Sequence, residues 1–127
     1  MNTELHTAVS KGDVHLTRLL LAHGADPNAE DDWENTPLHE AARARSVELA
    51  QLLLAHGADP NRYNVHDETP LAIAASRDVP ELVRLLLAHG ARPNVRDRYG
   101  FTPLSNAREI GTNRDVVQLL LEYGAVR

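Results

Sequence analysis

Residues Thr36 to Asn61 read TPLHEAARARSVELAQLLLAHGADPN, and both ends of this stretch recur along the chain at a fixed distance. The first triplet, Thr-Pro-Leu, returns 33 residues later at Thr69 and again at Thr102, and a related Thr3-Glu4-Leu5-His6 lies 33 residues upstream. The last six residues recur, with small changes, from His23, His56 and His89. Two markers that share one period predict a chain built from repeated units.

Each marker has a local physical role. The Thr36 hydroxyl is expected to accept a hydrogen bond from the first turn of a helix, and Pro37 fits the next position, where no amide hydrogen is needed. The second apolar segment, 48–54, is expected to end as a helix at Gly57, where a left-handed residue is favoured. The following segment, 58–64, is rich in Asp, Pro and Asn and is predicted to be an extended turn. Such short helices are marginal alone, so their stability must come from stacking.

The 33-residue period with T-P-L-H-x-A resembles the ankyrin repeat family, and the LLLAHGADPN ending is similar to that family too. The resemblance covers the whole chain. It implies an all-α fold, an ankyrin-repeat solenoid of four stacked helix-turn-helix units joined by hairpin-like turns. It further implies a single ankyrin repeat domain, 1–127, with repeats at approximately 1–30, 31–63, 64–96 and 97–127.

Two substitutions in the last repeat are typical of a repeat at the end of a stack. Arg108 stands where the earlier repeats have Val9, Ala42 and Ala75. Glu122 stands where they have Ala22, Ala55 and Ala88. Both are expected to place a polar group on a face that the inner repeats bury, as a terminal capping repeat requires. The chain is therefore expected to be complete.

Composition narrows the classes of function. The chain has 127 residues, a formal net charge of -5 and no cysteine, which excludes disulfides and thiolate sites and makes a cytoplasmic location the expectation. The sequence shows neither a signal segment nor an apolar run long enough to span a membrane. An acidic chain repels the phosphates of nucleic acid, so no nucleic-acid partner is expected. The locally basic group of Arg92, Arg96 and Arg98 is expected to meet an acidic patch on a protein.

Histidines and carboxylates raise metal-binding and catalytic alternatives. Three histidines occupy equivalent positions: His23, His56 and His89. Stacked helices lie roughly 8 to 10 Å apart, so a polar ladder at the helix ends is favoured over a shared metal. His39 opens a segment like the zinc-protease motif, but Arg43 replaces its second histidine. The acidic stretch 30–34 lacks the ligand pattern of a calcium loop and is expected to be a solvated turn. The sequence thus predicts no catalytic residue, metal or cofactor, and no enzyme.

The resemblance also implies where a partner protein binds. Ankyrin proteins use the tips of the turns and the exposed, concave side of the first helix of each repeat. The tip positions here are Asp32, Trp33, Asn35, Val65, His66, Glu68, Arg98, Tyr99 and Phe101. The adjoining helix positions are Arg43, Ala44, Ser76, Arg77, Glu109 and Ile110. Because aromatic and arginine side chains dominate interface energetics, the turns are the expected centre of binding.

Trp33 is the most informative of these residues. It is the only tryptophan, it lies in the acidic turn 30–35, and Glu34 follows it where the last turn has Gly100. Losing glycine there implies backbone strain or a different turn. We predict that the first turn is reshaped and that Trp33 is the principal anchor; the alternative is an exposed tryptophan without a role. Tyr99 and Phe101 are as consistent with structural covers as with binding residues.

The leading interpretation is a protein-protein interaction module, a rigid scaffold that is monomeric alone and acts as an adaptor or as an inhibitor. Two alternatives remain open. In one, exposed aromatic side chains pair copies of the chain, which makes it a self-assembling structural protein. In the other, the chain is the regulatory subunit of an enzyme complex.

Overall fold

A computed structural model describes residues 3–109, 111 and 114–126. This part of the chain contains α-helices and no strand, which confirms the all-α prediction. The helices are α1 (Glu4–Ser10), α2 (Val14–Ala22), α3 (Pro37–Arg43), α4 (Val47–Ala55), α5 (Pro70–Ser76), α6 (Pro80–Ala88), α7 (Pro103–Glu109) and α8 (Arg114–Glu122). Within the described residues, no helix has the length and apolar character needed to cross a membrane.

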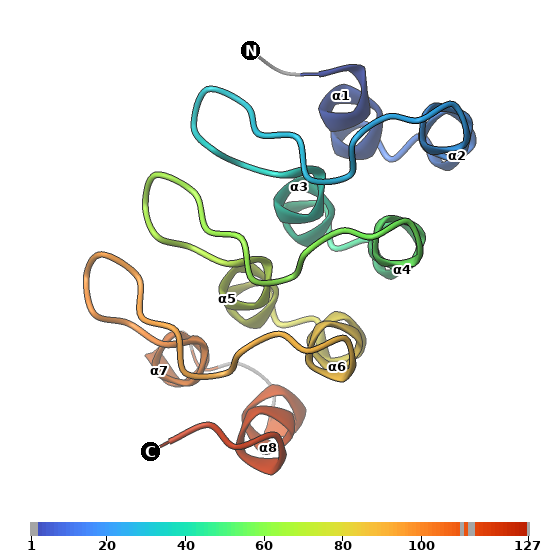
Figure 1. Cartoon of the computed structure of the whole chain (residues 1–127). Coiled ribbons are helices and arrows are strands. Elements are labelled where there is room, and N and C mark those ends of the chain that lie inside the picture. The colour runs from blue at the N-terminus through green and yellow to red at the C-terminus, as the bar shows by residue number, and fades with distance from the viewer. Residues whose placement is uncertain (1–2, 110, 112–113, 127) are drawn as a thin grey trace.

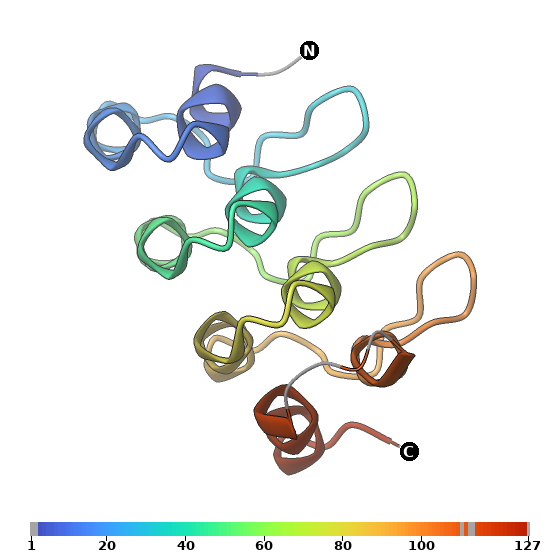
Figure 2. The same ribbon diagram turned by 180° about the vertical axis from the view of Figure 1, so that it is seen from behind.

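The helices form two stacked rows, with α1, α3, α5 and α7 in one and α2, α4, α6 and α8 in the other (Figure 1). Each helix contacts its pair mate and the next helix in its own row. The turns that follow α2, α4 and α6 project as three similar hairpins beside the first row, and the view from behind shows the same arrangement (Figure 2). The predicted solenoid of helix pairs joined by hairpin-like turns is confirmed.

The predicted start and stop signals are present at the helix ends. The Thr36 hydroxyl accepts a hydrogen bond from the backbone N–H of His39 at 3.4 Å, and Pro37 is the first residue of α3. Thr69 caps α5 in the same way, through the N–H of Ala72 at 3.2 Å. Beyond α4, Gly57 has a φ of 94°, a left-handed conformation that glycine adopts without a steric penalty.

The hydrophobic core lies between the two helix rows. It consists of leucine, alanine, valine and one isoleucine, and within the described residues it contains no aromatic side chain. Leu49 on α4 is completely buried, whereas Leu16, its equivalent on α2, is 39% exposed because the described residues place a second-row helix, α4, on only one side of α2. Burial of this position therefore depends on a neighbouring repeat, as expected for a solenoid.

A second set of contacts joins successive repeats at the ends of the second-row helices. The Asn28 side chain donates to the Gly57 carbonyl at 3.0 Å and accepts from the backbone N–H of Asp59 at 2.7 Å. Asn61 and Asn94 make the same pair of bonds to the repeats that follow them. The sequence pattern predicted only a turn at these asparagines, although their recurrence in three markers indicates a role between repeats.

The two substitutions expected at a chain end differ in outcome. Arg108 is exposed where Val9, Ala42 and Ala75 are buried, so this expectation is confirmed. The expectation for Glu122 is wrong. The alanines at its equivalent positions are themselves exposed: Ala22, Ala55 and Ala88. That position faces solvent in every repeat, so a glutamate there marks no end.

The paired positions 49 and 16 test the dependence on stacking. We expect Leu49→Ala to lower the free energy of unfolding by about 2 to 4 kcal/mol, because it leaves a cavity between repeats. Leu16→Ala removes the same atoms from a site that is already partly solvated, so its effect is expected to be less than half as large. Urea denaturation of both variants measures the difference, and equal losses would contradict the proposed role of the neighbouring repeat.

Candidate functional site

The three hairpin turns share one hydrogen-bonding scheme. In the first turn the Asp31 carboxylate accepts the backbone N–H groups of Trp33 at 2.8 Å and Asn35 at 2.9 Å. Asn64 and Asp97 do the same in the second and third turns. Partial burial raises the pKa of Asp31, but the hydrogen bonds from Asn35 and Trp33 together outweigh it and hold that pKa below its usual value. The carboxylate is therefore ionised at neutral pH and fixes the turn.

The first turn is not reshaped, so that prediction is wrong. Glu34 has a φ of 62° and Asp67 a φ of 59°, close to the left-handed conformation that Gly100 adopts with a φ of 84°. The hydrogen bond that closes the turn, from Glu34 N–H to the Asp31 carbonyl, is 3.0 Å long and recurs in the other two turns. The loss of glycine has therefore produced backbone strain and not a different turn, because the surrounding bonds hold Glu34 in place.

Backbone hydrogen bonds connect neighbouring hairpins side by side. The N–H of Val65 donates to the Trp33 carbonyl at 3.0 Å, and the N–H of Arg98 donates to the His66 carbonyl at 3.3 Å. The Arg98 guanidinium also donates to the Val65 carbonyl. Because each hairpin is tied to the next near its tip, the three tips form one connected surface rather than three separate loops.

Two buried histidines fasten the first helices to the hairpins of the next repeat. The His39 Nδ1 accepts the N–H of Thr36 at 3.0 Å, which leaves the proton on Nε2, and Nε2 donates to the Glu68 carbonyl at 2.8 Å. His6 makes the equivalent bond to the Asn35 carbonyl at 2.7 Å. Both histidines therefore have a structural role, because each joins a first-row helix to the hairpin that follows.

Burial determines the charge of His39. Loss of solvent, with a contribution from the Arg43 charge, lowers the pKa of His39 to about 4, against the opposing effects of the Glu68 carbonyl and of the Glu68 and Asp31 carboxylates. The ring is consequently neutral at pH 7, as its two hydrogen bonds require.

A polar network covers the surface between α3 and the second hairpin. Arg43 bonds to the Glu40 carboxylate at 3.1 Å and to the Asn35 side-chain oxygen at 3.1 Å, and it lies 3.8 Å from the Glu68 carboxylate. Asn64 donates to the Asn35 oxygen at 2.9 Å and to Glu68 at 3.0 Å. These groups hold one another, so Arg43 and Glu68 contribute to the shape of the concave face before any partner arrives.

Asn35 was predicted to bind a partner protein, but the structure buries it. Its residue is only 7% exposed, its carbonyl accepts from His6, and its side-chain oxygen accepts from Arg43 and Asn64. The hairpin turns this side chain inward because the buried polar groups around it need a partner. Asn35 therefore serves the scaffold and does not present its side chain to a partner protein.

The remaining expected residues fall into three groups. Ile110 lies outside the described residues. Val65, Glu68 and Arg43 are half-buried. The exposed ones are Asp32, Trp33, Ala44, His66, Ser76, Arg77, Arg98, Tyr99, Phe101 and Glu109. The structure thus places most of the expected residues on the surface of the hairpins and of α3, α5 and α7.

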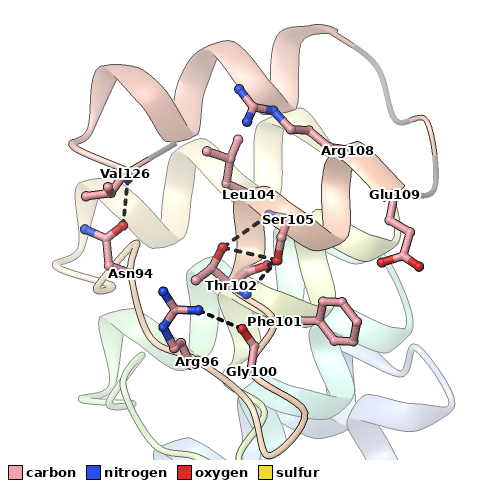
Figure 3. A pocket seen from close by; sticks show the side chains of 10 residues that line it. All are labelled: Asn94, Arg96, Gly100, Phe101, Thr102, Leu104, Ser105, Arg108, Glu109 and Val126. Atoms are coloured by element: carbon pink, nitrogen blue, oxygen red, sulfur yellow. Dashed lines mark hydrogen bonds between the residues drawn. The ribbon is translucent and has the colours of Figure 1, made fainter.

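A pocket of about 730 Å³ lies at the last repeat and was missed by the sequence analysis (Figure 3). Thr102, Leu104 and Ser105 lie between Arg96 and Arg108 in this view. The Ser105 hydroxyl bonds to the backbone of Thr102, and no histidine lines the pocket, so the serine has no imidazole base beside it. Two substitutions could have predicted that the surface differs at the last repeat. Ser105 stands at the position of His39, and Arg108 stands where the two preceding repeats have alanine.

The three equivalent histidines form a polar ladder at the helix ends, as predicted. Each ring bonds through Nδ1 to the carbonyl four residues earlier, at 2.8 Å for His23, 3.0 Å for His56 and 2.9 Å for His89. Among residues 3–109, 111 and 114–126, no three His, Asp or Glu side chains are arranged so that they could hold a metal ion.

Three sequence-family models match the chain. The model described as ankyrin repeat matches residues 2–32, that of ankyrin repeats in many copies matches 20–74, and that of three ankyrin repeat copies matches 61–126. The last of these covers more than half of the chain. No curated protein matches the sequence.

The neutral His39 ring predicts an acid-sensitive fold. The unfolded chain binds a proton at this histidine below about pH 6.5, whereas the folded chain does not until about pH 4. This contribution to stability is therefore complete above pH 6.5 and falls as the pH drops towards 4, by up to about 3 kcal/mol. We expect urea denaturation to show a shallower pH dependence for His39→Ser than for the wild type. The exposed His66→Ser is the matched control, and an NMR titration placing the His39 pKa near 6.5 would contradict the prediction.

Strain at Glu34 is tested by restoring glycine. Glu34→Gly is expected to stabilise the fold by roughly 0.5 to 1 kcal/mol, because glycine adopts the left-handed conformation without a steric penalty. Glu34→Ala keeps the Cβ atom while removing the same charge, and it is expected to give no gain. Thermal or urea denaturation distinguishes the two variants. An equal gain from both would show that charge repulsion, and not the backbone, is being relieved.

Proposed function

This chain belongs to the ankyrin repeat family, and from that premise we propose that it binds another protein through the surface formed by its hairpin tips and the exposed sides of α3, α5 and α7. Ankyrin repeats are in general protein-protein interaction modules, and the family is typically non-catalytic. The finer proposal is that this chain acts as an adaptor or as an inhibitor that covers its partner.

One observation carries the proposal: the hairpin tips expose large ring side chains on a backbone that is already fixed. Trp33 is 62% exposed and Tyr99 is 73% exposed, and both belong to turns joined by hydrogen bonds to the middle hairpin. Aromatic side chains contribute strongly to binding when a partner removes them from water. A fixed backbone adds to this, because little conformational entropy is lost on binding.

The helix side of the surface is suited to close approach. Ala44 and Ser76 are small and exposed, and Arg77 lies beside Ser76 at the end of α5. The network around Arg43 fills the space between α3 and the second hairpin, so a partner meets a continuous surface there. Four repeats at about 10 Å each give a length of roughly 40 Å, which is sufficient for an interface of about 800 Å² per partner.

Self-association is a second candidate because of a different surface. Leu16 and Leu19 on α2 are exposed at the first repeat, at 39% and 43%. Apolar side chains exposed at an end of a stack can be covered by a second copy. Light scattering decides between the candidates: a monomer across the micromolar range supports the leading proposal, and a dimer lost in Leu16→Ser supports self-association.

Affinity capture from the source organism, followed by mass spectrometry, tests the leading proposal. The double variant Trp33→Ala, Arg77→Ala is expected to reduce capture of the partner by at least about tenfold, because it removes an aromatic and an arginine anchor from one surface. Tyr123→Ala, Arg84→Ala is the matched control, since both residues are exposed and neither belongs to the proposed surface. The proposal fails if both double variants, folded by circular dichroism, capture the partner as well as the wild type.

A further inference from the structure

The hairpin tips carry one ring side chain each at equivalent positions, Trp33, His66 and Tyr99, which we call the tip row. All three are exposed. The hydrogen bonds from Val65 to the Trp33 carbonyl and from Arg98 to the His66 carbonyl connect the row along its length. Neighbouring members are therefore separated by about one repeat, roughly 10 Å, and the two ends by about 20 Å.

Charge changes in one direction along the tip row. The first hairpin, 30–35, has a formal charge of -4 from two aspartates and two glutamates. The second, 63–68, has -2 from one aspartate and one glutamate. The third, 96–101, has +1 from two arginines and one aspartate. A partner that lies along the row thus meets an acidic surface at one end and a basic surface at the other.

The acidic end is suited to a cationic side chain. Trp33 offers the face of an indole ring, to which ammonium and guanidinium groups are attracted. Asp32 and Glu34 are its neighbours in the chain, and both are exposed. Cation–aromatic attraction combined with nearby carboxylates favours a lysine or arginine over an apolar group at this position.

The basic end is suited to a carboxylate. Arg96 donates to the Gly100 carbonyl at 2.9 Å, so its guanidinium is held at the third hairpin. Arg98 donates to the Val65 carbonyl, so its guanidinium is held between the third hairpin and the second. A guanidinium carries five N–H donors, and one bond to a carbonyl leaves donors with which to bind a carboxylate. Tyr99 lies next to Arg98 and provides an aromatic contact there.

We propose that the tip row binds an extended segment of the partner protein that places a lysine or arginine on Trp33 and an aspartate or glutamate at Arg98. Because the Arg98 guanidinium reaches the second hairpin, it lies about one repeat from Trp33. That separation of roughly 10 Å corresponds to about three residues of extended chain at 3.3 Å each. This inference rests on the proposed function and specifies the chemistry of the partner. Nucleic acid does not fit the surface, because the four carboxylates of the first hairpin repel phosphates.

Peptide display tests the proposal with random peptides of about 12 residues, long enough to cover the span. The wild-type protein is expected to select sequences in which Lys or Arg is separated from Asp or Glu by about three residues. Fluorescence polarisation is then expected to show that Trp33→Ala weakens binding of the selected peptides by at least about tenfold. Tyr123→Ala, at an exposed aromatic residue outside the hairpins, is expected to leave their binding unchanged.

Changing the charges gives the sharpest comparison. The double variant Glu34→Lys, Arg98→Glu changes the formal charge of the first hairpin from -4 to -2 and that of the third from +1 to -1, so it is expected to select peptides without the wild-type charge order. Glu48→Lys, Arg84→Glu makes the same two substitutions at exposed positions away from the row and is expected to select the wild-type pattern. This comparison holds whichever direction the peptide takes along the row.

Other outcomes overturn the proposal in distinguishable ways. Selected peptides that depend on Trp33 but show no charge order would overturn the assigned chemistry and leave the proposed function intact. If no peptide depends on Trp33, an extended segment is not the occupant. If light scattering shows a dimer that Trp33→Ala abolishes, a second copy of the chain occupies the row. Undiminished capture of the partner by the folded Trp33→Ala, Arg77→Ala variant would instead refute the proposed function itself.

Discussion

Burial of each repeat by its neighbour is the constraint on which this structure depends. The first-row and second-row helices have seven and nine residues, which is shorter than helices that are stable alone in water. Leu49 is fully buried because the preceding repeat packs against it, and its equivalent Val116 in the last repeat is buried too, whereas Leu16 in the first repeat is 39% exposed. A chain that must stack its repeats necessarily places their turns at regular intervals along one side, and the candidate binding surface is a consequence of that regularity.

Apolar contacts alone leave the register of the stack poorly defined, and polar bonds between repeats define it. Asn28 and its equivalents connect the ends of the second row, while His6 and His39 connect the first row to the hairpins. No buried side-chain nitrogen or oxygen among the described residues lacks a hydrogen-bond partner. Because these bonds form within the chain, the hairpin tips are ordered before a partner binds, which reduces the entropy lost on binding.

Local signals explain why the fold was predictable from the sequence. Thr36, Pro37 and Gly57 act through their own backbone geometry, so their positions predict helix ends without knowledge of the neighbours. The site was less predictable because it depends on contacts between repeats. Asn35 turns inward towards His6, Arg43 and Asn64, and Glu34 retains the glycine-like turn because neighbouring hydrogen bonds hold it. Neither effect is visible in the spacing of residues.

The central claim is that one face, carried by the hairpin tips, meets the partner. The most direct measurement places a photocrosslinking amino acid in turn at Trp33, His66 and Tyr99, and for reference at His15 and Arg84, which are exposed on α2 and α6. Irradiation in an extract of the source organism is expected to yield an adduct with the same protein from the three tip positions and not from the two reference positions. Equal adducts from the reference positions, or adducts from those positions alone, would contradict the claim.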